Sequence, residues 1–254
     1  MGKVYLVGAG PGAADLLTLR AARALSQADV VFHDALVDEA VLALAPQARR
    51  VAVGKRCGQL STAQQFINRQ LVDAARRHAC VVRLKGGDPM LFGRAQEELS
   101  ALAEAGIDVE VVPGVSAAFG ASAALGCSLT RRGLSRSVMF LTPSVGKGEP
   151  EHAWAEAARG ADTVVLYMAS RQADAIARGL TAAGVPGARP AVLVENASLP
   201  TQRVLPTTVA RLPEAARQLG GGPALILVGE VYAELIERAA ELDGAAAERR
   251  SAAA

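Results

Sequence analysis

Three segments that contain glycine carry residue types that suit ligand binding in this chain. The first, Gly8–Gly12, follows the apolar run Val4–Val7, and the second is Gly86-Gly87-Asp88. The third, Pro113–Ala117, also follows an apolar run. Glycine lets a backbone approach a ligand closely, and open α/β sheets bind ligands at the carboxyl ends of their strands. The segments therefore predict a small-molecule site at those strand ends.

Two charged side chains in the same region suit proton transfer. Asp34 directly follows the apolar run Val30–His33, and Lys55 follows the next apolar run. A carboxylate and an ammonium group at the ends of neighbouring strands could take up and donate protons. Each also has a structural interpretation: Asp34 could cap a helix that starts near Asp38, and Lys55 could form a solvated pair with Arg56. The pattern alone leaves both interpretations open.

The first glycine segment also fits a dinucleotide-binding fingerprint. Gly8, Gly10 and Ala13 give G-x-G-x-x-A after a strand, and Asp34 lies near the distance expected for a ribose-binding acid. An NAD-dependent oxidoreductase is therefore an alternative function. Pro11 argues against it, because proline lacks the amide that a pyrophosphate would need there.

Composition excludes several classes of protein. Hydrophobic residues make up 51% of the 254 positions and charged residues 20%, which predicts a folded core. The formal charge of +2 gives no support for a nucleic-acid partner. Cys57, Cys80 and Cys127 lie far apart and the histidines show no ligand spacing, so we expect no disulfide framework and no metal. Without a long apolar run, we expect no membrane association and a cytoplasmic protein.

Strand-like and helix-like stretches alternate, which predicts an α/β fold with mostly parallel sheets. The expected strands are Val4–Val7, Val30–His33, Arg50–Val53, Val81–Leu84, Val109–Val112, Val138–Leu141, Val164–Met168, Ala191–Val194 and Ala224–Val228. The expected helices are Leu16–Ala28, one that starts at Ser61 with Gln64 as its capping-box partner, Ala95–Glu104, Arg171–Ala183 and Val209–Leu219.

The alternation divides into two parts. We expect an N-terminal α/β domain at 1–113, a junction at 114–136, a C-terminal α/β domain at 137–243 and a frayed tail at 244–254. Thr201–Leu205 follows the preceding strand after a short connection, which predicts an antiparallel pair in the C-terminal domain. In the helix that starts at Ser61, Ile67, Leu71 and Ala74 lie on one face and are expected to be buried.

Together the motifs resemble the tetrapyrrole methylase family. The resemblance runs from about Val4 to Val231 and is carried by V-G-A-G-P-G, H-D-A-L-V, V-G-K-R, L-K-G-G-D-P, F-G-R, V-P-G-V-S-A, V-L-Y-M, V-E-N and P-A-L-I-L-V-G, in the family's order and spacing. Arg131 and Thr142-Pro143-Ser144 depart from the family pattern, which often has histidines there.

The resemblance implies a two-domain class III methyltransferase with S-adenosyl-L-methionine (SAM) bound in the cleft between the domains, usually as a homodimer. The implied reaction methylates uroporphyrinogen-III at carbons 2 and 7, giving precorrin-2 and S-adenosyl-L-homocysteine (SAH). A relative that acts on a later corrin precursor, such as precorrin-4, is the alternative. The implied cofactor contacts are Pro11, Gly86, Gly87, Asp88, Leu91, Ser116, Ala117, Met168, Ala197 and Ala224.

The resemblance also assigns the charged residues. It makes Asp34 the proton acceptor and Lys55 the proton donor. An anionic tetrapyrrole requires cations, and arginine binds carboxylates in a bidentate manner. The candidates for substrate binding are Arg20, Arg56, Arg131 and Arg132.

Overall fold

The computed structural model describes residues 2–53, 64–144 and 152–241. The chain divides into two compact units, residues 1–120 and 121–254. The division falls inside α5 (Ala117–Leu125), which lies within the predicted junction 114–136.

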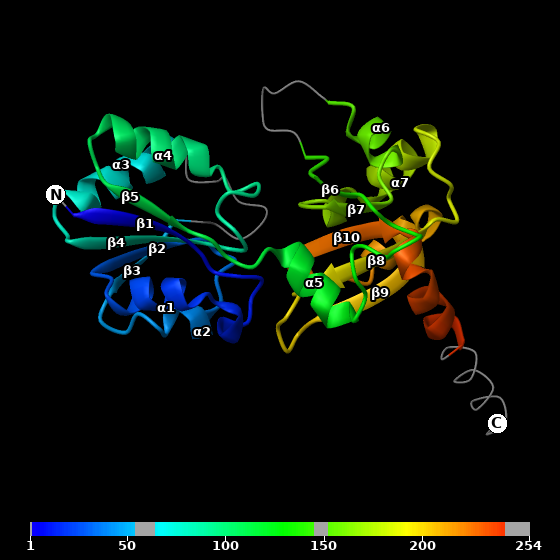
Figure 1. Cartoon of the computed structure of the whole chain (residues 1–254), viewed down its shortest axis with the longest axis horizontal. Helices are drawn as coiled ribbons and strands as arrows, with labels where there is room; N and C mark the ends of the chain where they lie inside the picture. Colours follow the sequence, from blue (N-terminus) through cyan, green and yellow to red (C-terminus); the bar gives the residue numbers. More distant parts are fainter. Residues whose placement is uncertain (1, 54–63, 145–151, 242–254) are drawn as a thin grey trace. The chain divides into compact units, whose positions relative to one another are not determined.

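The first unit contains a five-stranded parallel sheet (Figure 1). Its strands are β1 (Lys3–Gly8), β2 (Val30–His33), β3 (Arg49–Ala52), β4 (Cys80–Lys85) and β5 (Val109–Val112), in the order β3-β2-β4-β1-β5. All four strand pairings are parallel, so every strand ends at the same edge. We call this edge the carboxyl edge.

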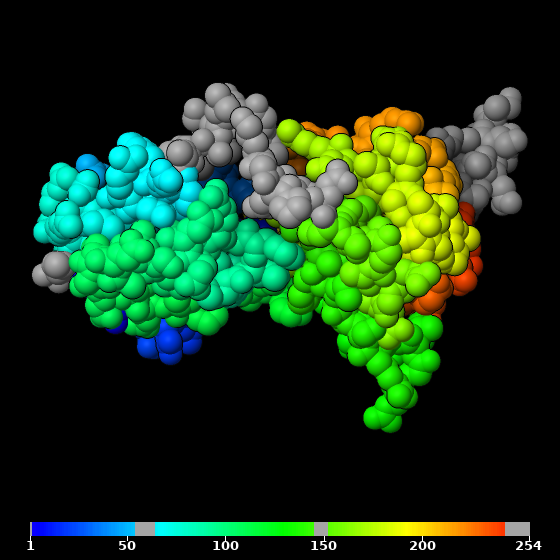
Figure 2. All heavy atoms as spheres, turned by 90° about the horizontal axis from the view of Figure 1, so that it is seen from above, coloured from blue at the N-terminus to red at the C-terminus, as the bar shows by residue number. Residues whose placement is uncertain are grey.

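Helices cover both faces of this sheet because its strands are apolar on both sides. The helices α1 (Leu19–Ser26) and α2 (Glu39–Leu42) lie on one face, and α3 (Gln64–Ala75) and α4 (Ala95–Glu104) lie on the other (Figure 1). The space-filling view shows α3 and α4 over the second face (Figure 2). Val82 and Leu84 of β4 pack with α1 and α2, while Val81 packs with α3 and α4.

The second unit contains a mixed five-stranded sheet in the order β6-β7-β10-β8-β9. Its strands are β6 (Val138–Leu141), β7 (Thr163–Leu166), β8 (Pro190–Glu195), β9 (Arg203–Thr208) and β10 (Ala224–Gly229). Its core also includes residues of α6 (Trp154–Arg159), α7 (Ala173–Ala182) and α8 (Leu212–Ala216). Among the pairings of this sheet, only β6 with β7 is parallel.

The predicted α/β fold class is confirmed, and β2, α4, β5 and β6 have the predicted bounds. The predicted helix Leu16–Ala28 is shorter, because Thr18 has an extended backbone and its side chain accepts the Ala21 amide as the N-cap of α1. The antiparallel β8–β9 pair is confirmed. Antiparallel pairing extends further than predicted, since β10 is antiparallel to both neighbours and periodicity does not report strand direction.

Helix α3 buries the face that the sequence predicts, although Ser61 lies outside the described residues. Ile67, Leu71 and Ala74 are all buried against the sheet. Within the described parts of the chain, no helix is both long enough and apolar enough to cross a membrane.

Leu71→Ala should lower the free energy of unfolding by about 2–5 kcal/mol, because the Leu71 side chain is fully buried and its removal leaves a cavity. Urea denaturation followed by circular dichroism measures the change. Gln65→Ala, at an exposed position of the same helix, is the matched control and should change stability by less than about 0.5 kcal/mol. Equal effects of the two substitutions would contradict the packing of this face.

Candidate functional site

Two adjacent inner strands of the first sheet, β4 and β1, lead to helices on opposite faces. Strand β1 leads to α1, and its neighbour β4 leads to α4 (Figure 1). Such a reversal opens a crevice at the carboxyl ends of the two strands, where open α/β sheets bind ligands. The glycine segments Gly8–Gly12 and Gly86–Asp88 follow these two strands. The structure therefore places both segments at the switch point of the sheet.

The three glycine segments touch through their backbones at the carboxyl edge. Gly10 and Gly87 exchange two hydrogen bonds, with the Gly87 amide donating to the Gly10 carbonyl at 2.7 Å and the Gly10 amide donating to the Gly87 carbonyl at 3.2 Å. A Cβ on Gly8 would lie 2.6 Å from the Gly114 Cα, and one on Gly114 would lie 2.3 Å from the Gly87 carbonyl oxygen. No larger residue fits at Gly8 or Gly114 without separating the segments.

Asp88 ties the second segment to the third. Its Oδ1 accepts the Met90 amide at 2.8 Å, and its Oδ2 accepts the Gly114 amide at 2.9 Å. Both carboxylate oxygens therefore bind backbone groups of the same unit. Asp88 shapes the segment that the family resemblance assigns to the cofactor.

The backbone beside Gly87 offers room for a ligand. Gly87 has φ +68°, and among the described residues other than its chain neighbours a Cβ there would meet one atom within 4 Å, the Ala117 amide nitrogen at 3.9 Å. Ala117 is the first residue of α5, and Ser116 before it is buried. The open space beside Gly87 and the nearby amides at the start of a helix fit a polar ligand such as SAM. Leu91, another predicted contact, lies half-buried in the turn that follows Asp88.

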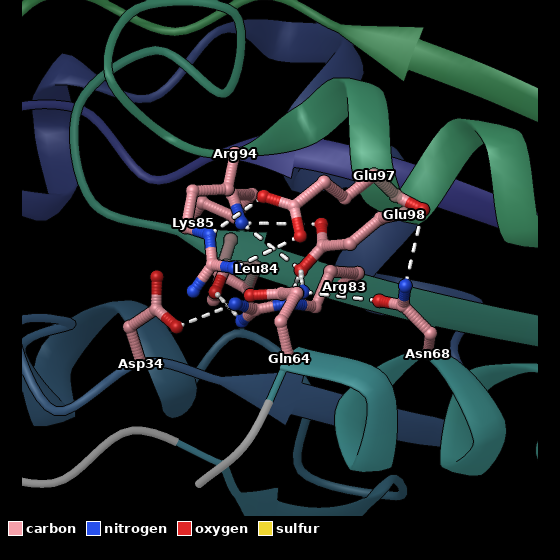
Figure 3. Close-up of polar contacts among 9 residues, drawn as sticks. All are labelled: Asp34, Gln64, Asn68, Arg83, Leu84, Lys85, Arg94, Glu97 and Glu98. Atoms are coloured by element: carbon pink, nitrogen blue, oxygen red, sulfur yellow. Dashed lines mark hydrogen bonds and ion pairs between the residues drawn. The ribbon is translucent and has the colours of Figure 1, made fainter. Parts of the chain in front are cut away.

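Asp34, the predicted proton acceptor, belongs to a buried network of charges (Figure 3). Its Oδ1 accepts Nη2 of Arg83 at 2.6 Å. Nε of Arg83 donates to Oε1 of Glu98 at 3.0 Å, and Nζ of Lys85 lies 3.1 Å from both oxygens of Glu98. The helix α2 does not need Asp34 as a cap, because Asp38 caps it by accepting the Ala40 amide.

Alternation along β4 explains the position of this network. Arg83 and Lys85 lie two and four residues after Val81 and so point to the same face, which α4 covers with Glu98. The side chains of Arg83, Lys85 and Glu98 are all at least 96% buried. Burial and the neighbouring Arg83 lower the pKa of Lys85, while Glu98 opposes that shift. With Asp34, the network has two positive and two negative groups.

Lys55 and Arg56, the predicted proton donor and one predicted substrate contact, lie outside the described residues. The chain is described again from Gln64, the first residue of α3 in the structure. Its Nε2 donates to Oε1 of Glu98 at 3.1 Å, so the start of α3 joins the buried network.

The predicted contacts in the second unit gather at one end of its sheet. Met168 follows β7, Ala197 follows β8, and Ala224 begins β10, which is antiparallel to both. Met168 has φ +54° and is 56% exposed. An exposed methionine in the left-handed region is strained, and such strain clusters at functional sites.

The predicted substrate arginines have different surroundings. Nη1 of Arg131 donates to Glu234 Oε1 at 2.7 Å, so a substrate carboxylate would have to replace an existing partner. Arg20 lies 3.8 Å from Glu110, and Arg132 is exposed. Arg20 belongs to the first unit, and Arg131 and Arg132 belong to the second.

Hydrogen bonding in the first glycine segment disfavours a dinucleotide. The Ala9 amide donates to the Lys85 carbonyl at 2.7 Å, and the Gly10 amide donates to Gly87. Asp34, which would hold the ribose, instead pairs with Arg83. Pro11 packs against α5, because a Cβ on Gly120 would lie 2.7 Å from the Pro11 Cβ.

Among the described residues, no group of three or more acidic, histidine or cysteine side chains could hold a metal ion.

Sequence reasoning missed Arg83, Lys85 and Glu98. A signal was present, because two cations alternate within a strand that is otherwise apolar and must be buried. Buried cations require an anionic partner. The partner could not be identified from the sequence, since three glutamates lie in α4.

Comparisons with known proteins agree with this architecture. The family described as Tetrapyrrole (Corrin/Porphyrin) Methylases matches residues 3–213. A protein of Pseudomonas aeruginosa named uroporphyrinogen-III C-methyltransferase is 44% identical over 93% of this chain and 97% of its own length. A siroheme synthase of Zymomonas mobilis is 44% identical over 91% of this chain, which spans only 49% of that protein.

Two solved structures are similar over most of the chain. The uroporphyrin-III C-methyltransferase of Thermus thermophilus, in complex with S-adenosyl homocysteine, has a TM-score of 0.80 and 42% identity, covering 91% of this chain and 98% of that one. A cobalt precorrin-4 methyltransferase has a TM-score of 0.78 and 31% identity, covering 90% of this chain and 95% of that one. The chain belongs to the tetrapyrrole (corrin/porphyrin) methylase family.

Proposed function

We propose that this chain transfers methyl groups from SAM to carbons 2 and 7 of uroporphyrinogen-III, giving precorrin-2. The observation that carries this proposal is the match to nearly the full length of the Pseudomonas uroporphyrinogen-III C-methyltransferase. The Thermus structure with bound SAH supports SAM as the methyl donor. Siroheme synthases are about twice as long as the matched region, so the proposal is limited to methylation.

A methyltransferase for a later corrin precursor is the second candidate. The cobalt precorrin-4 methyltransferase supports it with a similar TM-score but lower identity, 31% against 42%. The higher identity to the uroporphyrin-III C-methyltransferase favours the earlier substrate.

The chemistry makes modest demands on the protein. Bound SAM supplies an electrophilic methyl group, and the pyrrole carbons of a porphyrinogen are electron-rich enough to attack it. Alignment of the reactants can contribute about 7–11 kcal/mol in well-oriented systems. The methylated ring then loses a proton, and we assign its uptake to Asp34, with Lys55 as the proton donor.

We assign the cofactor to the segment around Gly87 and to the start of α5. Gly86, Gly87, Ser116 and Ala117 would bind SAM through their backbones, and Asp88 would hold the segment in shape through Met90 and Gly114. Pro11, Leu91, Met168, Ala197 and Ala224 complete the proposed set of contacts. A homodimer and a cytoplasmic location remain predictions.

Purified protein incubated with SAM and uroporphyrinogen-III should yield two equivalents of SAH and a product heavier by two CH2 units, because each added methyl group is accompanied by the loss of one proton. Mass spectrometry under anaerobic conditions measures the product. Precorrin-4 is the control substrate and should gain no methyl group. Methylation of precorrin-4 alone would transfer the assignment to the second candidate.

Asp88→Ala should weaken SAH binding about tenfold or more by calorimetry, because the Met90 and Gly114 amides lose their acceptor and the segment loosens. Asp73→Ala, which removes an exposed aspartate of α3, is the control and should bind SAH like the parent. Unchanged affinity in both variants would remove Asp88 from the cofactor site.

Asp34→Asn should reduce kcat by about 10²-fold or more, because asparagine keeps the size of the side chain but cannot take up a proton. SAH affinity should be unchanged if Asp34 handles protons. If Asp34 instead held a ribose of the cofactor, calorimetry would show weakened SAH binding as the main effect. Wild-type turnover would leave catalysis to alignment alone.

A further inference from the structure

We infer that Arg83 and Glu98 are positioning residues that fix the orientation of the Asp34 carboxylate, an inference that rests on the role of Asp34 in the proposed function.

Asp34 is held at both its backbone and its side chain. Its amide donates to the Leu84 carbonyl at 3.3 Å, which extends the pairing of β2 with β4 by one residue. Its Oδ1 accepts Nη2 of Arg83 at 2.6 Å. The side chain is 28% exposed, so the carboxylate is still accessible at the carboxyl edge. The bonds to Leu84 and Arg83 therefore select one orientation of the Asp34 carboxylate, which is still exposed enough to contact a ligand.

Arg83 is itself fixed by three separate hydrogen bonds. Nη2 donates to Asp34, Nε donates to Glu98 at 3.0 Å, and Nη1 donates to the Leu84 carbonyl at 3.1 Å. The guanidinium is planar and rigid, so holding two of its nitrogens determines where the third points (Figure 3). A lysine has one nitrogen and could not reach Asp34 and Glu98 with the same geometry.

Glu98 holds Arg83 in place from the buried end of the network. It is fully buried and accepts bonds from Arg83, Lys85 and Gln64. A charge network buried this deeply is weak evidence for stability, because apolar residues of similar volume often stabilise a core equally well. The network instead runs from the core to the single partly exposed carboxylate at its end, Asp34. That path fits a role in orienting Asp34.

A double-mutant cycle with Asp34→Asn tests the inference. Arg83→Met keeps an unbranched apolar stem, removes the guanidinium group and leaves Lys85 paired with Glu98. It should lower kcat for uroporphyrinogen-III about 10–10²-fold, with SAH affinity unchanged. In the Asp34→Asn background the same substitution should cause no further loss, because the group that it positions has lost its function.

Glu98→Gln should behave in the same way, since it acts through Arg83: a lower kcat alone, and no further loss with Asp34→Asn. Lys3→Met is the matched control. Lys3 is a cation of the same sheet that also pairs with two carboxylates, but at the opposite edge, so kcat should stay at the parent value.

If Arg83→Met does not fold, Arg83→Lys replaces it in the cycle, because it keeps the buried charge. A further loss of kcat in the Asp34→Asn background would overturn the inference.

A readout independent of turnover separates this inference from the proposed function. In protein labelled with carbon-13 at aspartate carboxyls, the Asp34 signal is identified by its loss in Asp34→Asn. Arg83→Met and Glu98→Gln should shift or broaden that signal, and Lys3→Met should not. If the parent enzyme fails to methylate uroporphyrinogen-III, the proposed function fails and the carbon-13 signal still decides the positioning. An unchanged signal in Arg83→Met would overturn it.

Discussion

Gly8, Gly87 and Gly114 bring three loops of the first unit into direct backbone contact, and the shape of the candidate site depends on that contact. A Cβ at Gly8 or Gly114 would lie within 2.3–2.6 Å of the facing backbone. Because the loops follow three adjacent parallel strands, β4, β1 and β5, the sheet delivers them to one edge. The Asp88 carboxylate then binds the Gly114 amide and holds two of the loops together. The residue without a side chain at the centre, Gly87, is left facing the start of α5.

The same unit contains a network of charged side chains, Arg83, Lys85, Glu98 and Asp34, that a purely structural core would not require. Two cations and two anions occupy the end of a face that is otherwise apolar. Each buried charge loses its hydration, and the loss is offset only where partners are close and hydrogen-bonded. Here Arg83 and Glu98 meet this condition, with contacts of 2.6–3.1 Å. Burial, followed by the neighbouring Arg83, lowers the pKa of Lys85, and Glu98 opposes that shift.

The sequence predicted the α/β class and most strands, because apolar runs of four to six residues between helical stretches are typical of parallel strands. It also predicted that Asp34 and the glycine segments lie at one edge, since parallel strands end together. It did not predict that β10 runs antiparallel to β7 and β8, because an apolar run has no direction. Nor did it reveal the Arg83–Glu98 pair, which depends on how α4 lies over β4. The spacing of residues along the chain does not tell which glutamate of α4 contacts Arg83.

An arginine-bound carboxylate suits the chemistry proposed for Asp34. Attack by a pyrrole carbon on a sulfonium methyl leaves positive charge on the ring, and a proton leaves such a ring without a strong base. Position then matters more than basicity, because the acceptor must lie within hydrogen-bond reach of the proton that leaves. Pairing one oxygen, Oδ1, with Arg83 fixes the plane of the carboxylate and determines where Oδ2 points. Because Arg83 already occupies Oδ1, only Oδ2 of Asp34 is left to meet a ligand. We propose that Oδ2 is the atom that takes up the proton.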